Sequence, residues 1–233
     1  MTLLKYRDDK EINLFLFENR FKLIFKDEFR RDYTKYKNLL SHLSSMCKYE
    51  LDGKTMALSG EYIDEKLKLI KNGYKALDIC LVVDKDTEQI YGFIITYIGD
   101  CDYKNFRNIP ALSIICSNKK GVAKLLMFIY IYSMKLSDKS YKYGLLNLAY
   151  GLVNIKAYCL YSKFGFAFYP FLSGCFSEND EPMIIDIMKI DIEKIKQIVI
   201  NKIHDPHRDP RCINQSLSLH PRPENLNSRS HKR

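Results

Sequence analysis

The sequence contains no tryptophan and no apolar run of the length that a membrane-spanning helix needs. Its longest apolar run, LLMFIYIYSM from Leu125, is about as long as a core helix. Charged residues in the opening MTLLKYRDDKE stand where a signal peptide would be apolar. The seven cysteines show no paired metal-type spacing, and Cys80, Cys116 and Cys159 lie in apolar runs. We therefore expect a cytoplasmic protein with reduced, buried thiols, no bound metal and no membrane partner.

Acidic residues are scarce in the middle of the chain. Between residues 103 and 177 the single acid is Asp138, whereas ten basic residues lie there, so this window accounts for the whole net charge of +9. Such a local excess predicts affinity for a phosphorylated ligand. A nucleic acid is a broader alternative, which no recognised nucleic-acid motif supports, and a solvated lysine-rich surface is another.

The length of 233 residues and an apolar fraction of 46% suit one α/β domain with extensions. Apolar spacing predicts an edge strand over 1–7, a helix over 10–19, and a lysine-rich, mostly helical segment over 21–71 with a turn near 52–53. The elements expected after it are strands over 76–84, 89–100 and 111–117, a helix over 121–136, a strand over 143–151, a helix over 154–164, closing strands over 166–172 and 182–191, and a helix over 192–203. The strands over 76–84 and 89–100 should pair as an antiparallel hairpin.

Residues 204–233 have a different composition, rich in His, Pro and Arg and poor in large apolar groups. Such a segment buries too little surface to offset its ordering entropy, which predicts a basic, disordered tail. Its His204, His207 and Cys212 are conceivable metal ligands, but a flexible tail lacks the supporting second layer of contacts that metal ligands need. A weak tether to an acidic partner is the favoured role.

The segment ALSIICSNKKGVA, residues 111–123, runs from a β-branched strand directly into a helix. A helix start leaves backbone N–H groups unpaired at the positive end of the helix dipole, which makes an anion site. Gly121 allows the backbone to approach a phosphate closely, and Lys119, Lys120 and Lys124 add positive charge. The segment predicts a site for a phosphorylated ligand.

Two motifs together resemble those of the GCN5-related N-acetyltransferases (GNAT family). Asn118-Lys-Lys-Gly121-Val-Ala123 is similar to the family's [RQ]-x-x-G-x-[GA] acetyl-CoA motif, and an Asn-x-x-Ala-x-x-x-Tyr-x-x-x-Gly-Phe segment follows from Asn154 to Phe166. The resemblance is close over 76–170 and loose over 1–75 and 171–203. It implies a mixed, splayed β-sheet flanked by helices, with a helical substrate-side part (1–75), a cofactor-binding core (76–191) and a terminal helix (192–203) in one domain.

The resemblance also implies an enzyme that moves an acetyl group from acetyl-CoA, as co-substrate, to a primary amine by direct attack. Backbone N–H groups around Lys119–Lys124 would hold the coenzyme A pyrophosphate, and the pantetheine arm would bond along the end of the strand over 111–117. Tyr161 matches the tyrosine that protonates the departing thiolate. The expected cofactor contacts are Ile114, Ile115, Cys116, Asn118, Lys119, Lys120, Gly121, Val122, Ala123, Lys124, Asn154 and Tyr158.

Plainer roles remain open for several of these residues. Asn154 is also a good helix N-cap, and Tyr158 and Tyr161 are also typical of the edge of a core. Helical spacing puts Asn154, Tyr158 and Tyr161 on one face, which we expect to meet the ligand while Ala157, Leu160 and Phe164 pack on the sheet. Cys116 beside three lysines is a conceivable acyl-carrying nucleophile, but a buried, inert thiol is favoured.

The sequence departs from the family pattern in ways that touch the chemistry. Asn118 replaces Arg or Gln, a contact that Lys119 or Lys120 can cover, and no acid lies in 103–137. The proton of an amine would then pass to Asp100, Asp102, Glu178 or a chain of waters. The missing acid favours an alternative function, a catalytically degenerate module that binds acyl-CoA or a protein partner. The acceptor stays open among small amines, peptide N-termini and lysine side chains.

Overall fold

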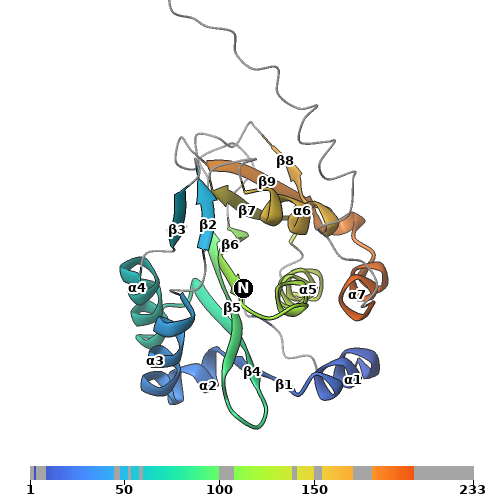
Figure 1. Cartoon of the computed structure of the whole chain (residues 1–233). Helices are drawn as coiled ribbons and strands as arrows, with labels where there is room; N and C mark the ends of the chain where they lie inside the picture. The colour runs from blue at the N-terminus through green and yellow to red at the C-terminus, as the bar shows by residue number, and fades with distance from the viewer. Residues whose placement is uncertain are drawn as a thin grey trace, which may run out of the picture.

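The computed structural model describes residues 3, 9–44, 48–51, 54–57, 60–99, 108–137, 141–149, 154–169 and 180–201 (Figure 1). The predicted edge strand over 1–7 and the predicted tail over 204–233 therefore lie outside the described residues, except for Leu3. The elements, in chain order, are α1 (Lys10–Glu18), β1 (Phe21–Phe25), α2 (Lys26–Arg31), α3 (Tyr33–Ser44), β2 (Lys48–Leu51), β3 (Lys54–Ala57), α4 (Gly60–Lys71), β4 (Leu77–Asp84), β5 (Ile90–Gly99), β6 (Ile109–Ser117), α5 (Val122–Lys135), β7 (Tyr143–Ala149), α6 (Ile155–Lys163), β8 (Ala167–Phe168), β9 (Asp180–Asp186), the 3-10 helix η3 (Ile187–Lys189) and α7 (Ile192–Ile200).

Seven strands form one mixed sheet in the order β1-β4-β5-β6-β7-β9-β8, and β2 and β3 form a separate hairpin. The described ladders are antiparallel except for β6 with β7, which run parallel. A parallel pair needs a crossover, and α5 is the helix that connects β6 to β7. The predicted α/β class, the mixed sheet and the β4–β5 hairpin are therefore confirmed.

Helices cover both faces of the sheet (Figure 1). The core between the sheet and α1, α5, α6 and α7 contains Cys80 and Val82 of β4, whereas the core on the side of α2, α3 and α4 contains Ile79 and Leu81. Because neighbouring residues of a strand point to opposite faces, a strand covered on both sides must be apolar throughout. This explains why β4 is buried along its whole length.

The segment over 21–71 is less helical than the sequence predicts. Phe21–Phe25 forms a strand at the end of the sheet, paired with β4, and residues 48–57 contain the β2–β3 hairpin. The five residues FKLIF fit a helical period as well as an alternating one, so pairing with β4 decided their conformation. The predicted closing strand over 182–191 also ends earlier, because Ile187–Lys189 turns into η3.

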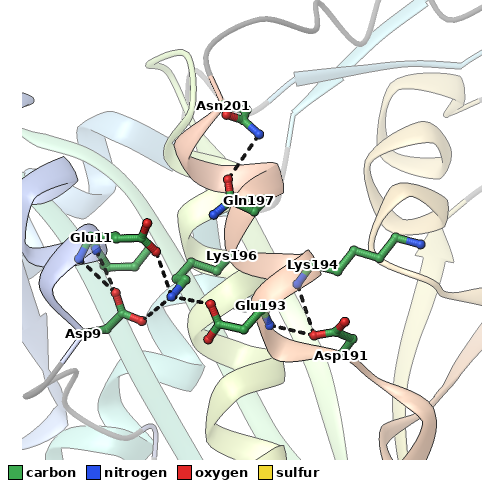
Figure 2. A network of polar contacts seen from close by, with 9 residues as sticks. Asp9, Glu11, Asp191, Glu193, Lys194, Lys196, Gln197 and Asn201 are labelled. Atoms are coloured by element: carbon green, nitrogen blue, oxygen red, sulfur yellow. Dashed lines mark hydrogen bonds and ion pairs between the residues drawn. The ribbon is translucent and has the colours of Figure 1, made fainter.

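Helices α1 and α7 are joined by a charged cluster around Lys196 (Figure 2). Its Nζ lies 2.8 Å from Asp9 Oδ2, 2.8 Å from Glu11 Oε2 and 2.5 Å from Glu193 Oε2. Hydrogen bonds to these carboxylates raise the pKa of Lys196. Asp9 also caps α1 through the N–H groups of Glu11 and Ile12, so the same carboxylate starts this helix and holds it to α7.

Within the described part of the chain, no helix combines the length and the apolar character needed to cross a bilayer.

Candidate functional site

Strands β6 and β7 part from each other in the middle of the sheet. Their ladder consists of two pairs, Ala111 with Leu145 and Leu112 with Leu146. Beyond these pairs β6 continues along β5 as far as Ser117, and β7 continues along β9. The sheet therefore opens between residues 113–117 of one strand and residues 147–149 of the other.

A β-bulge at Ser113 lies where the strands part. Ile95 of β5 faces Ile114, but the next residue, Thr96, faces Leu112, so Ser113 is the extra residue. A bulge bends its strand and changes the face to which the following side chains point. Leu112 belongs to the core on the α5 side, and Ile114 belongs to the core on the opposite side. The bulge thus redirects β6 at the point of divergence.

Tyr130 of α5 supports the last paired residues of the two strands. Its hydroxyl lies 2.9 Å from the carbonyl oxygen of Pro110 and 2.9 Å from that of Leu145, so it can donate to either strand. The side chain is fully buried, and burial raises the pKa of Tyr130. Because this hydroxyl contacts carbonyl groups of both strands, it holds β6 and β7 together just before they part.

The ladder register indicates which backbone groups of β6 face the opening. Asn118 N–H donates to Tyr91 O at 3.0 Å, and hydrogen-bonded pairs recur every second residue in an antiparallel ladder. The backbone groups of Ile114 and Cys116 therefore face β5. Those of Ile115 and Ser117 face away from β5, toward the opening.

The turn before α5 contains several backbone amides that form no hydrogen bond to another described residue. Gly121, the N-cap of α5, has φ +88°, a conformation that favours glycine. Asn118 and Val122 donate their amides to protein carbonyls. The amides of Lys119, Lys120, Gly121 and Ala123 have no acceptor among the described residues. Four amides at a helix start thus lie where the sequence predicts an anion site, and the binding of an anion there stays a prediction.

The lysines of this turn differ in their surroundings. Lys119 Nζ lies 3.9 Å from the ring centroid of Tyr91 and 5.1 Å from that of Phe21, which are cation–π distances. Lys120 is exposed, and Lys124 is half-buried. Lys119 is thus held over two aromatic rings at the β1–β5 side of the turn, while Lys120 extends into solvent.

Helix α6 carries the second motif, and both of its faces pack. Phe164 is fully buried and Ala157 and Leu160 pack against the core, as predicted, but Tyr158 and Tyr161 are buried in the same core as well. The contact of the tyrosine face with a ligand stays a prediction. Large rings bury more apolar area than alanine does, which gives the tyrosine side the stronger tendency to pack.

The individual contacts of α6 define what its motif residues do in the fold. Asn154 is the N-cap, and its Oδ1 accepts from Ala157 N–H at 3.4 Å. Tyr158 stacks on Phe168 with centroids 5.2 Å apart. Tyr161 packs edge-on against Phe166 at 6.4 Å, and burial raises its pKa well above the usual value for tyrosine. Its hydroxyl is therefore harder to deprotonate than that of an exposed tyrosine.

Cys116 differs from the other described cysteines. Cys80 and Cys159 are free and buried, as predicted. Cys116 is disulfide-bonded, so the prediction of a reduced thiol is wrong for this residue. Because Cys80 and Cys159 are free, its partner lies outside the described residues. Spacing along the chain does not reveal which sulfur atoms meet in space. In this form Cys116 has no thiolate and is no nucleophile.

A cleft of about 640 Å³ opens on the other face of the sheet, under α4. Tyr62 Oη of α4 lies 3.2 Å from Ser113 Oγ, so the cleft reaches the bulge. Its volume is in the range of small-molecule sites. The lining residues are Tyr62, Lys66, Leu69, Tyr74, Ala76, Leu77, Tyr97, Ile98, Leu112, Ser113 and Asn147.

No acid is among the described residues that line this cleft. The candidate bases Asp100, Asp102 and Glu178 lie outside the described residues. Asp78 follows the lining residue Leu77, but its oxygens accept from Leu3 N–H at 2.6 Å and Ile79 N–H at 2.8 Å. Burial raises the pKa of Asp78 to about 6.

In the described part of the chain, no three His, Cys, Asp or Glu side chains gather as metal ligands do.

Sequence reasoning missed the bulge at Ser113, the brace at Tyr130 and the α4 wall of the cleft. A polar serine inside the apolar run ALSIICS was a signal for the bulge. Tyr130 lies in a continuous apolar helix, and no pattern distinguishes it from its neighbours. In the sequence, Tyr62 and Lys66 cannot be distinguished from solvent-exposed helix residues, because their place in the cleft depends on how α4 packs on the sheet.

Neither the protein-family models nor the curated proteins compared with the sequence match it. Solved structures of GNAT-family N-acetyltransferases do match, at low sequence identity. A family member from Desulfovibrio desulfuricans is 9% identical with a TM-score of 0.49, over 72% of this chain and 99% of that chain. A variant of the spermidine N-acetyltransferase from Vibrio cholerae is 18% identical with a TM-score of 0.46, over 73% of this chain and 95% of that chain.

The NatC complex, solved with a Gag peptide and CoA, is 15% identical with a TM-score of 0.44, over 64% of this chain and 89% of that chain. These similarities concern the arrangement of helices and strands. The chain has an α/β fold with a seven-stranded mixed sheet.

Proposed function

We propose that this protein is an N-acetyltransferase that moves the acetyl group of acetyl-CoA to a primary amine within a ternary complex. The observation that carries the proposal is the meeting of two openings at Ser113. The parted strands β6 and β7 lead from the bulge to the unpaired amides of the Gly121 turn. On the opposite face, the cleft under α4 reaches the same serine. A long thioester and an amine can thus approach one point from two sides.

In this proposal the backbone holds the thioester substrate. Amides of Lys119, Lys120, Gly121 and Ala123 bind its diphosphate, because unpaired N–H groups at a helix start favour negative charge. The outward-facing backbone groups of Ile115 and Ser117 bind the pantetheine arm as an added strand would bind. A Cβ atom added at Gly121 would meet no atom closer than Phe15 Cζ at 4.0 Å, so that side of the turn is not filled by other side chains.

The remaining motif residues border this path in the proposal. Asn118, Val122 and Lys124 shape the turn and add to its positive field, and Asn154 and Tyr158 contribute from α6. The Oδ1 of Asn154 caps its helix, so its amide nitrogen is the atom that can reach the arm.

The reaction requires two proton movements. The neutral amine nitrogen forms the bond to the thioester carbon, the carbon–sulfur bond breaks, and the electron pair leaves on sulfur. Tyr161, whose hydroxyl is protonated at neutral pH like that of any tyrosine, donates the proton that the sulfur takes up. The proton of the amine passes to water or to an acid outside the described residues. Holding both reactants at Ser113 supplies most of the acceleration.

A second candidate is a module that binds acyl-CoA without turnover. The absence of an acid among the described cleft residues favours it. Both candidates bind the coenzyme, so binding alone does not separate them. Tyr161→Phe does, because it removes the hydroxyl and keeps the ring that packs on Phe166.

The test combines calorimetry with a thioester-release assay. We expect coenzyme A and acetyl-CoA to bind and a 3′-dephospho analogue to report the contribution of the remote phosphate. Free thiol should then appear when amines are added. Binding without release over a broad amine panel would support the second candidate, and no binding of either compound would refute both.

A further inference from the structure

We infer that the acceptor amine carries an anionic group, which Lys66 of α4 binds. This inference rests on the proposed function, because it names the substrate class of the cleft under α4. The argument starts from the way α4 is docked. Ile63, Leu67 and Ile70 are buried in the core, so the neighbouring stripe of Tyr62, Lys66 and Leu69 faces the cleft.

Lys66 is the cation among the described residues that line this cleft. No ion pair joins it to an acid among the described residues. Of the three acids of α4, Glu61, Asp64 and Glu65, none forms an ion pair with Lys66, and Asp64 lies 3.5 Å from Lys37 instead. Lys66 Nζ instead lies 5.1 Å from the ring centroid of Tyr62. A lysine that lines a cleft without an acidic partner is a point charge for an anion from solution.

The other polar groups of the cleft are neutral hydroxyls and amides from Tyr62, Tyr97, Ser113 and Asn147. They suit the uncharged part of a small acceptor. A diamine or polyamine would place a second positive charge in a cleft that already holds Lys66, and no described lining residue carries the acid that such a charge needs. The lining therefore favours an anionic acceptor over a polycationic one.

The positions on α4 also set a length. Tyr62 lies at the bulge through its contact with Ser113, and Lys66 lies one turn further along the helix, about 6 Å away along its axis. Because Lys66 Nζ lies 5.1 Å from the ring centroid of Tyr62, an acceptor whose amine reaches the bulge needs only a short chain to present its anionic group to Lys66. Carboxylates and phosphates share this chemistry, because Lys binds either as a point charge.

The experiment compares acceptors of matched length in the thioester-release assay. The panel contains ω-amino carboxylates of increasing chain length, the corresponding amino phosphates, simple alkylamines and diamines. Binding of the same compounds to the full chain with coenzyme A is measured in parallel by calorimetry. The variants are Lys66→Glu, Lys66→Gln and, as the matched control, Lys68→Glu, which makes the same charge change on an exposed part of α4.

We expect the wild-type protein to prefer anionic acceptors and Lys66→Glu to lower their kcat/KM by about 10- to 100-fold, the range for a hydrogen bond to a charged group. Lys66→Gln should have a smaller effect, and Lys68→Glu almost none. The ratio of carboxylate to phosphate acceptors tells which anion the cleft takes.

The outcomes separate this inference from the proposed function. Transfer with equal use of anionic acceptors and diamines, or an equal effect of Lys68→Glu, would overturn the inference and leave the acetyltransferase standing. Coenzyme-dependent binding of anionic amines that Lys66→Glu abolishes, without release of thiol, would support the inference and refute the transfer. Absence of both binding and transfer for anionic amines, in a protein that acetylates other amines, would overturn the inference.

Discussion

Replacing Gly121 with alanine tests the anion site with a change of one methyl group. Gly121 has φ +88°, which costs a residue with a side chain about 1–2 kcal/mol. The added Cβ would meet Phe15 Cζ at 4.0 Å, an ordinary contact, so packing adds no further cost. We therefore expect Gly121→Ala to fold and to lose about 1–2 kcal/mol of stability.

The effect on coenzyme binding should be larger than this loss of stability implies. If strain moves the turn away from φ +88°, at least one amide no longer points at the diphosphate. A hydrogen bond to a charged group contributes about 1.5–3 kcal/mol, so the Kd for coenzyme A should rise by about 10- to 100-fold. Calorimetry with purified protein measures this Kd, and chemical denaturation measures the stability.

Gly165→Ala is the matched control. Gly165 has φ +93°, and its Cβ would meet Ile190 Cδ1 at 3.6 Å, so its strain and packing are similar. It follows α6, outside the turn that precedes α5. We expect the same loss of stability with an unchanged Kd. An unchanged Kd in Gly121→Ala, or an equal loss in Gly165→Ala, would refute the placement of the diphosphate.

Three further changes test other parts of the structure. Tyr161→Phe should lower kcat for acetyl transfer by about 10²–10⁴-fold, the usual contribution of a general acid, with an unchanged Kd for acetyl-CoA, and steady-state kinetics that show full activity would remove Tyr161 from the mechanism. Tyr130→Phe should cost about 1–3 kcal/mol in denaturation experiments, because the buried carbonyls of Pro110 and Leu145 lose their common donor. Asp78 has a pKa of about 6 in the folded protein against 3.8 ordinarily, so the folded state holds a proton that the unfolded state releases between these values. The wild type should therefore lose about 2 kcal/mol relative to Asp78→Asn as the pH rises from 4 to 6, and parallel pH profiles of the two proteins would contradict this.

The regular elements of the core were predictable because burial imposes strong periods on the sequence. The strands over 76–84, 89–100 and 111–117 and the helix over 121–136 appear as β4, β5, β6 and α5, with ends shifted by one or two residues. Local backbone chemistry likewise predicted the Gly121 turn, since a glycine between a strand and a helix favours a positive φ.

Long-range contacts decided the parts that the sequence did not reveal. Phe21–Phe25 is a strand because β4 offers it a partner far along the chain. The tyrosine side of α6 is buried because aromatic rings of the core, such as Phe166 and Phe168, meet it there. A short stretch of sequence does not contain the residues that pack on it in the fold, so its apolar pattern fits more than one conformation.

The sequence by itself determined the α/β class, the order of the core elements and the turn at Gly121, because each depends on neighbours along the chain. Only the tertiary structure decided where β6 and β7 part, what Tyr130 holds together and that Lys66 faces a cleft ending at Ser113. These features join residues that are distant in sequence, and they exist only once the sheet and helices have packed.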